Sequence, residues 1–311
     1  MFILLISLFL QLPAQASEKL PSQTLAVQFR RGNETILQYT KPGFSLDRLH
    51  NVQSLSKSIL SLLTGIAVET KAISSLQENI SPQLWPNDPA KFNLNFEELL
   101  SMRSGLPSTS RGSYGSWVTK KNWVNYFLQK KQNAEKPFSY STGDSHLLAV
   151  ILGKKVGGLE KFAWDKLFTP LGIKTAVWDH DPQGNVFGGN NLSLSFASVW
   201  KLGELVLNSG KYNEQQLVPA SWLTKVVEKH ASPPDEFVDF TVRGYGYFWW
   251  LVRVNDEDGI CALGYGGQFL CLFPRIKGQF LIFSEVPKDV AKVRRHYQEI
   301  QKLLQSLVKQ R

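Results

Sequence analysis

Residues 51–58 have the sequence Asn-Val-Gln-Ser-Leu-Ser-Lys-Ser and lead into a segment dense in Leu, Ile, Ala and Val. No turn residue interrupts this segment before Gly65, which predicts a helix over 54–69 that is buried on most of its sides. Ser54 and Lys57 are one helical turn apart, so their side chains point to the same face and the amine can reach the hydroxyl.

This pair has the chemistry of a nucleophile and its base. A serine at a helix amino terminus gains free backbone N–H groups and the positive end of the helix dipole, both of which favour an oxyanion. A lysine in a dry cleft has its pKa lowered by desolvation, which makes it a base near neutral pH. Ser54 could therefore become nucleophilic without a histidine.

The Ser-x-x-Lys spacing occurs at two further places, Ser198/Lys201 and Ser306/Lys309, so the tetrapeptide alone is weak evidence. The pair at 306 lies on an amphipathic segment among Gln and Lys, which favours a solvated face. The pair at 198 has no third polar group nearby in the sequence. Only Ser54 opens a buried helix.

The rest of the chain predicts an α+β fold. Strands are expected at 25–31, 34–40, 244–253, 259–263, 269–273 and 279–285. Gly32-Asn33 is typical of a hairpin turn between the first two, and short turns join the last four into an antiparallel meander. Residues 288–310 predict a helix across the sheet, with one face formed by Val290, Val293, Tyr297, Ile300, Leu303, Leu304 and Leu307.

The middle of the chain alternates helical pieces with Gly, Pro and Asn loops. We expect a sheet region made of residues 17–72 and 185–311, with a mainly helical region, 73–184, inserted between them. No repeat or linker divides the chain, so the two regions are expected to form one composite domain.

Composition narrows the functional classes. The chain has 311 residues, is 43% hydrophobic and carries 35 Lys plus Arg against 26 Asp plus Glu, a net charge of +9. That charge suits an anionic neighbour, but no basic motif interleaved with aromatic residues indicates a nucleic acid. Two cysteines exclude a four-cysteine metal site, and no organic cofactor or metal is expected.

The first residues predict export. Met1 to Leu12 is almost wholly apolar, and Ala14-Gln15-Ala16 follows Pro13. The run is too short to span a bilayer, and Ala-x-Ala suits a signal peptidase. We expect residues 1–16 to be a signal peptide of a bacterial protein that is periplasmic or secreted, with no transmembrane helix once it is removed; an uncleaved anchor is the alternative, since no Lys or Arg precedes the run.

Several ordered motifs resemble the serine β-lactamase and penicillin-binding-protein superfamily. Residues 51–58 resemble its nucleophile segment. Residues 99–106 resemble its helix-to-loop element, 138–144 (Phe-Ser-Tyr-Ser-Thr-Gly-Asp) its Tyr-x-Asn box, and 264–268 (Gly-Tyr-Gly-Gly-Gln) its third, strand-borne box. Phrases at 170–173, 217–222 and 245–250 are similar to the class C-like branch, which includes esterases, amidases and nylon-oligomer hydrolases.

The resemblance implies the β-lactamase/transpeptidase-like fold and a set of site residues. Ser54 would form an acyl-enzyme, with Lys57 and Tyr140 handling its proton, and a lysine ammonium would lower the pKa of the tyrosine. The backbone N–H groups of Ser54 and Gln268 would form the oxyanion hole. Substrate would meet Thr142 and the third box, Tyr265, Gly266 and Gly267.

Two of these motifs depart from the β-lactamase pattern. Thr142 stands where lactamases carry Asn, and Tyr265-Gly266 stands where Lys-Thr helps to hold a substrate carboxylate. A small-molecule or peptide-like neutral ester or amide is therefore expected as substrate, with weak or no penicillinase activity. The alternatives are a peptidoglycan DD-peptidase or amidase, and a catalytically silent recognition protein; a cell-envelope polymer is a further candidate partner.

Four other features do not by themselves indicate a functional site. The run Trp178-Asp179-His180-Asp181 contains metal-ligand types, but a turn before Pro182 is favoured. Asp144 would cap a helix or orient the site, with capping favoured. Cys261 and Cys271 fit a disulfide between neighbouring strands and two buried thiols equally well. Lysine pairs at 120/121, 130/131 and 154/155 favour a solvated face.

Overall fold

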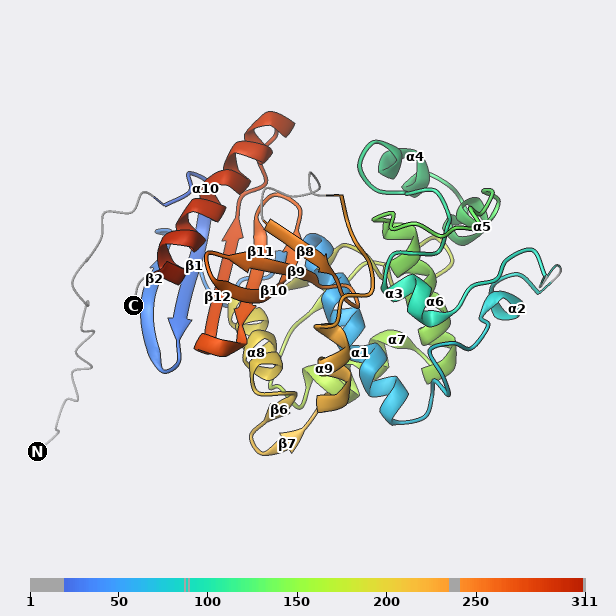
Figure 1. Cartoon of the computed structure of the whole chain (residues 1–311), viewed down its shortest axis with the longest axis horizontal. Helices are drawn as coiled ribbons and strands as arrows, with labels where there is room; N and C mark the ends of the chain where they lie inside the picture. The colour runs from blue at the N-terminus through green and yellow to red at the C-terminus, as the bar shows by residue number, and fades with distance from the viewer. Residues whose placement is uncertain (1–19, 87, 89, 235–240, 310–311) are drawn as a thin grey trace, which may run out of the picture.

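The computed structural model describes residues 20–309 except 87, 89 and 235–240. Its centre is an antiparallel sheet of seven strands in the order β2-β1-β12-β11-β10-β9-β8 (Figure 1). The expected signal peptide lies outside the described residues. No helix of the described part is long and apolar enough to cross a membrane.

The amino-terminal hairpin supplies one edge of the sheet. β1 (Thr24–Arg31) and β2 (Glu34–Thr40) pair around Gly32, whose φ of +56° is a conformation that glycine adopts without strain. β1 is largely buried and pairs on its other side with the last strand, β12 (Gly278–Ser284). Segments from the two ends of the chain therefore lie side by side in one sheet.

The carboxy-terminal meander differs from the prediction at one place. The sequence predicts one strand over 244–253, but these residues contribute to two, β8 (Thr241–Tyr245) and β9 (Trp250–Val254). A tight turn separates them, with the Gly246 N–H bonded to the Trp249 carbonyl and Phe248 at a φ of +61°. Aromatic residues dominate this segment, so its turn carries no Pro or Asn signal.

β10 (Glu257–Gly264) and β11 (Gln268–Phe273) complete the sheet and border the third sequence box. Cys261 lies directly opposite Cys271 in their register, and the structure joins the two in a disulfide. A direct cross-strand pair has the short separation that a disulfide needs, here a Cα–Cα distance of 4.2 Å.

Helices cover both faces of the sheet. α10 (Val290–Lys309) crosses one face (Figure 1). On the other side, α8 (Phe196–Leu207) packs against β11 and β12, and α1 (Ser56–Glu69) packs against β10. The buried face of α10 contains Val293, His296, Ile300, Leu303, Leu304, Leu307 and Val308. The prediction was wrong for Val290, which is 77% exposed because it lies at the start of the helix beyond the sheet.

The inserted region is helical. It contains the α-helices α2 (Ser81–Leu84), α3 (Phe96–Leu100), α4 (Tyr114–Val118), α5 (Trp123–Leu128), α6 (Thr142–Val156) and α7 (Leu159–Ala163), and the short turns η2 (Arg111–Ser113) and η3 (Trp164–Phe168). Two small sheets lie outside the central one: β3 (His50–Asn51), β5 (Leu192–Leu194) and β4 (Val177–Trp178) form one, and β6 (Lys211–Tyr212) and β7 (Gln215–Gln216) form another beside α8. The remaining elements are the helix α9 (Ala220–Val226) and the turn η5 (Pro274–Ile276), which lies between β11 and β12.

α1 (Ser56–Glu69) joins the two regions. Its residues 56–67 are all buried, and it contacts both α6 and β10. Gly65 is needed in the middle of this helix, because a Cβ there would lie 2.3 Å from the ring of Trp222. Ser54 lies just before α1, in the 3-10 turn η1 (Gln53–Leu55), so the α-helix begins two residues later than predicted.

Candidate active site

Ser54 and Lys57 form the centre of the site. The Lys57 Nζ lies 2.9 Å from the Ser54 Oγ, which is the contact that the one-turn spacing predicts. The 3-10 turn tightens the chain here but keeps both side chains on one face. The nucleophile and base geometry expected from the sequence is therefore present.

Lys57 is almost wholly enclosed, with 1% of its surface exposed. Burial disfavours the ammonium and lowers the pKa of this amine to about 7. The Gly189 carbonyl accepts a hydrogen bond from Nζ, and the Thr142 hydroxyl accepts a second at 3.4 Å. In the neutral amine those two N–H groups are used, which leaves the lone pair free to accept the Ser54 proton.

Tyr140 is the third member of the site. The Lys57 Nζ lies 5.2 Å from the centre of its ring, and Trp250 stacks on the ring at a centroid distance of 5.5 Å. Burial raises the pKa of this phenol to about 12, although a hydrogen bond to the Ser54 side chain acts in the opposite direction. The expected fall in its pKa is wrong, because burial of the phenol disfavours the phenolate and outweighs the hydrogen bond to Ser54.

Thr142 begins α6 and lies inside the site. Its hydroxyl contacts Lys57 and also Ser110, whose Oγ is 3.0 Å away and accepts the Thr142 N–H at 2.9 Å. The neighbouring Ser108 hydroxyl donates to the Tyr140 carbonyl at 2.6 Å, and the Gly143 N–H donates to Thr109 at 2.7 Å. The loop 108–110 therefore holds the whole Tyr140–Thr142 box from outside.

The third box approaches the nucleophile through its backbone. A Cβ on Gly264 would lie 2.3 Å from the Val52 carbonyl, two residues before Ser54, so only glycine permits this approach. Gly266 and Gly267 follow at φ values of +79° and +96°. The Gln268 side chain is buried, donating to the Ser284 carbonyl and contacting His50 at 3.0 Å, which fixes the start of β11.

Comparison with known proteins agrees with this geometry. The family model described as Beta-lactamase matches residues 15–305. The chain belongs to the beta-lactamase family. The fold is accordingly the β-lactamase/transpeptidase-like α+β fold of serine hydrolases, as the sequence motifs implied.

Relatives of this β-lactamase-family chain include hydrolases. The 6-aminohexanoate-dimer hydrolase of Paenarthrobacter ureafaciens is 21% identical over 285 residues, covering 83% of this chain and 71% of the relative. The D-amino acid amidase of Ochrobactrum anthropi superposes with a TM-score of 0.69 at 14% identity, covering 92% and 94% of the two chains. A penicillin-binding protein homologue of Pyrococcus abyssi gives 0.69 at 15% identity, covering 94% and 74%.

The Asp144 carboxylate of this family member is buried beside the site. Its Oδ1 accepts the Ser104 hydroxyl at 2.8 Å, and its Oδ2 has no hydrogen-bond partner among the described residues. Burial raises the pKa of this group to about 8, against the effect of the Ser104 hydrogen bonds. The favoured capping role is wrong, because Asp144 accepts from the Ser104 turn rather than from the first N–H groups of α6.

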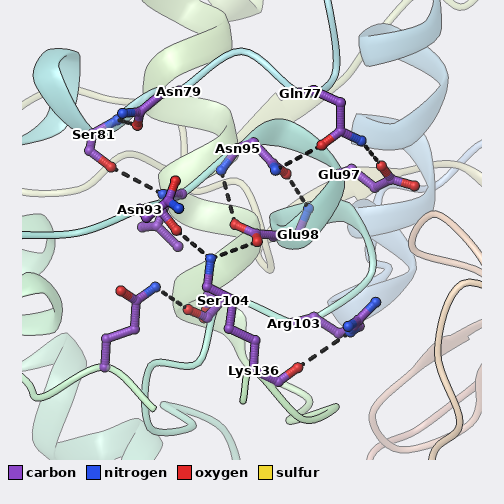
Figure 2. A network of polar contacts seen from close by, with 12 residues as sticks. Gln77, Asn79, Ser81, Asn93, Asn95, Glu97, Glu98, Arg103, Ser104 and Lys136 are labelled. Atoms are coloured by element: carbon purple, nitrogen blue, oxygen red, sulfur yellow. Dashed lines mark hydrogen bonds and ion pairs between the residues drawn. The ribbon is translucent and has the colours of Figure 1, made fainter. Parts of the chain in front are cut away.

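The turn that carries Ser104 is itself anchored by polar contacts (Figure 2). Asn95 and Glu98 form a reciprocal capping box at the start of α3. Lys136 forms an ion pair with Glu98 at 2.6 Å, and its carbonyl accepts from Arg103 at 3.3 Å. Through Ser104, this network connects α3 to the first turn of α6, which carries Thr142.

The remaining candidates of this family member lie outside the site. Ser198 contacts Ser195 at 2.8 Å, and Lys201 donates to backbone carbonyls, so this Ser-x-x-Lys pair is structural. Asp181 accepts the backbone N–H groups of a turn and contacts His146 at 3.0 Å. Among the described residues no cluster of three metal-ligand side chains occurs.

Sequence reasoning missed the backbone partner of Lys57. Gly189 and the loop 108–110 carry no motif that marks them, because their roles depend on a carbonyl and on hydroxyls common in any loop. One signal was available: Gly188-Gly189 is a glycine pair, and Cβ atoms there would clash with Ser145. Such a pair indicates a close backbone approach.

Proposed function

We propose that this chain is an exported serine hydrolase that cleaves a neutral ester or amide through an acyl-Ser54 intermediate. The observation that carries the proposal is the 2.9 Å contact between the Ser54 Oγ and a buried lysine whose pKa is about 7. A neutral amine at that distance is a competent general base near neutral pH.

Acylation begins with Lys57 as a neutral amine and Tyr140 as a neutral phenol. The Ser54 Oγ attacks the substrate carbonyl carbon while its proton passes to the Lys57 Nζ. The backbone N–H groups of Ser54 and Gln268 are the proposed donors to the oxyanion. Tyr140, a neutral phenol, gives its proton to the leaving oxygen or nitrogen and regains one from the Lys57 ammonium, so the acyl-enzyme forms with both groups neutral.

Deacylation reverses the proton path. Water attacks the acyl carbon and passes a proton to Lys57, and the collapsing tetrahedral species releases the acid as Ser54 regains a proton. Burial keeps Tyr140 protonated throughout the neutral range, since the pKa of this phenol is about 12. We therefore assign Lys57 the role of base and Tyr140 the role of proton donor.

The substrate-binding surface supports a neutral substrate. Tyr265 is 47% exposed at the third box, where a carboxylate-binding cation would otherwise stand. The Thr142 hydroxyl already contacts Lys57 and Ser110, so it has one hydrogen-bonding position left for a substrate, fewer than the carboxamide of an asparagine would offer. We propose Thr142, Tyr265, Gly266 and Gly267 as the substrate-contacting residues, and small amides of the kinds named for the relatives as candidate substrates.

A fluorophosphonate probe tests the nucleophile. We expect labelling of the wild type at Ser54 and none of a Ser54→Ala variant, with the labelled peptide identified by mass spectrometry. Ser198→Ala is the matched control, because it removes the serine of the other buried Ser-x-x-Lys pair and should label normally. Labelling that persists in Ser54→Ala would overturn the assignment.

A substrate panel tests the specificity. We expect kcat/KM for p-nitrophenyl acetate to exceed that for benzylpenicillin by at least roughly tenfold, because a missing charge-assisted contact costs about 1.5–3 kcal/mol. The 6-aminohexanoate dimer and D-phenylalanine amide complete the panel. Comparable turnover of penicillin and the ester would contradict the proposal.

Export has its own test. Cleavage after Ala16 predicts that the mature protein begins at Ser17, which amino-terminal sequencing of protein from a bacterial envelope fraction would show. Retention of Met1 would indicate an uncleaved anchor instead.

A further inference from the structure

An apolar surface lies beside the third box. Three of the exposed large hydrophobic residues belong to the third box or to the segment from the end of β12 to the start of α10: Tyr265 at 47%, Val286 at 40% and Val290 at 77%. Val286 lies over Gly266, because a Cβ added to that glycine would be 2.7 Å from a valine methyl group, so Val286 and Tyr265 are neighbours. Val290 begins α10 four residues later. We call these three residues the apolar edge.

Basic side chains surround the apolar edge. Lys288, Lys292, Arg294 and Arg295 are all exposed, and Asp289 is the single acidic residue between 286 and 295. In the described part of the chain no carboxylate lies within ion-pair distance of Lys288, Lys292 or Arg295, whereas Lys41, nearby in the sheet, is paired with Glu285 at 2.8 Å. The charges of Lys288, Lys292 and Arg295 are thus available to an external partner.

This surface is connected directly to the site. The Tyr297 hydroxyl of α10 accepts the Gly266 N–H at 2.9 Å, and Gly267 packs against His296 and Ile300 of the same helix. Gln268, whose N–H is the proposed oxyanion donor, follows at once. A partner bound at the start of α10 would therefore lie on the helix that contacts the third box directly.

We propose that the apolar edge and the first turns of α10 dock this protein onto an anionic phospholipid surface. Basic side chains beside a bilayer are attracted by the surface potential of anionic headgroups, and exposed apolar side chains enter the interface. The buried face of α10 is already used by the sheet, so the helix contributes its charged face and its exposed first residue. A soluble polyanion would bind the lysines, but it would not bury the apolar side chain of Val290.

The docking does not depend on hydrolysis. If Ser54 acts as proposed above, the docked orientation also brings the third box close to the lipid surface, which favours an amphiphilic ester or amide as substrate. That consequence rests on the proposed function, whereas vesicle binding can be measured on a Ser54→Ala variant.

Sedimentation with vesicles tests the docking. The mature chain is mixed with vesicles of equal parts phosphatidylglycerol and phosphatidylcholine, or of phosphatidylcholine alone, at low and high salt. We expect binding to the anionic vesicles that weakens with salt. Lys288→Gln with Lys292→Gln should weaken it roughly twentyfold, since each charge contributes about fivefold. Val290→Asp should weaken it at least roughly tenfold, because it replaces interfacial apolar surface by charge.

The matched control removes the same charge elsewhere. Lys211→Gln with Lys225→Gln changes two exposed lysines on β6 and α9, which lie along the lower edge of the molecule in Figure 1, away from α10. We expect binding within threefold of wild type, and circular dichroism of each variant should match it. An equal loss in the control, or no vesicle binding, overturns the proposal. Binding to long-chain polyphosphate that is unchanged by Val290→Asp, with no such binding to vesicles, indicates a polyanion site instead and also overturns it.

Discussion

Lys57 and Tyr140 show how one physical effect can prepare two opposite roles. Burial favours the neutral form of each group, so it lowers the pKa of the amine to about 7 and raises that of the phenol to about 12. The neutral form of lysine is a base, whereas the neutral form of tyrosine is an acid. The spacing Ser-x-x-Lys predicted the first role, but the direction of the Tyr140 pKa shift depended on how completely the phenol itself is buried.

The pH dependence of the ester reaction reports the Lys57 pKa. Because the neutral amine is the active form, kcat/KM should rise about tenfold per pH unit below about 7 and then level off. Lys57→Arg should lose activity at every pH, since a guanidinium stays protonated. Lys201→Met, in the structural Ser-x-x-Lys pair, is the control and should keep the wild-type midpoint. A midpoint near 10 would mean that Lys57 is solvated.

The buried Asp144 makes stability depend on pH in a definite direction. Its pKa is about 8 in the folded chain and about 4 when unfolded, so between these values the folded state holds one more proton. The contribution of Asp144 to the free energy of unfolding is therefore greatest below about pH 4. It falls as the pH rises from 4 towards 8, by up to ~1.4 kcal/mol per pH unit.

An Asp144→Asn variant removes this titration and keeps an acceptor for Ser104. Its free energy of unfolding relative to wild type should improve progressively from about pH 5 to about pH 8, measured by urea denaturation. Ser198→Ala serves as the control without a titratable change. A difference that stays constant over this range would show that Asp144 is ionised in the folded protein.

At the scale of elements, the site depends on how closely α6 meets the loop before β5. Gly188 and Gly189 lie against the first turns of α6, and this contact brings the Gly189 carbonyl to Lys57. Periodicity predicted the amino-terminal hairpin, most of the meander and the terminal helix. Which loop carbonyl meets the lysine could not be predicted, because the partners are more than a hundred residues apart.

Gly189→Ala should push the loop before β5 away from the first turn of α6. The new Cβ would lie 2.3 Å from the Ser145 Oγ and 2.6 Å from a Thr142 methyl group, which should cost about 1–3 kcal/mol of stability and lower kcat by displacing the carbonyl. Gly115→Ala in α4, whose Cβ meets nothing within 4 Å, is the control. Full activity in Gly189→Ala would show that the carbonyl contact is dispensable.

For the whole molecule, one hydrophobic core extends through both regions. Leu62 of α1, Leu147 of α6 and Phe280 of β12 belong to a single buried cluster. α1 runs between the helices and the sheet, so neither region can lose its packing without exposing this helix. We therefore propose that the composite arrangement is one folding unit.

Cooperative unfolding checks that proposal. Tryptophans lie in both regions, for example Trp117 in the helical part and Trp249 beside the sheet, so fluorescence reports on each. We expect the fluorescence and far-ultraviolet circular dichroism transitions in urea to coincide with one midpoint. Two resolved transitions would show that the helical region unfolds separately.

In the sequence, the resemblance of several ordered motifs to a known superfamily indicated the family and its α+β fold. Local periodicity predicted the outer hairpin and the terminal helix, and the one-turn spacing predicted the contact between Ser54 and Lys57. The tertiary structure decided the protonation states, the Gly189 contact, the buried Asp144 and the exposure of Val290. Each of those depends on how completely distant segments exclude water from one side chain, and solvent exclusion is a property of the packed molecule.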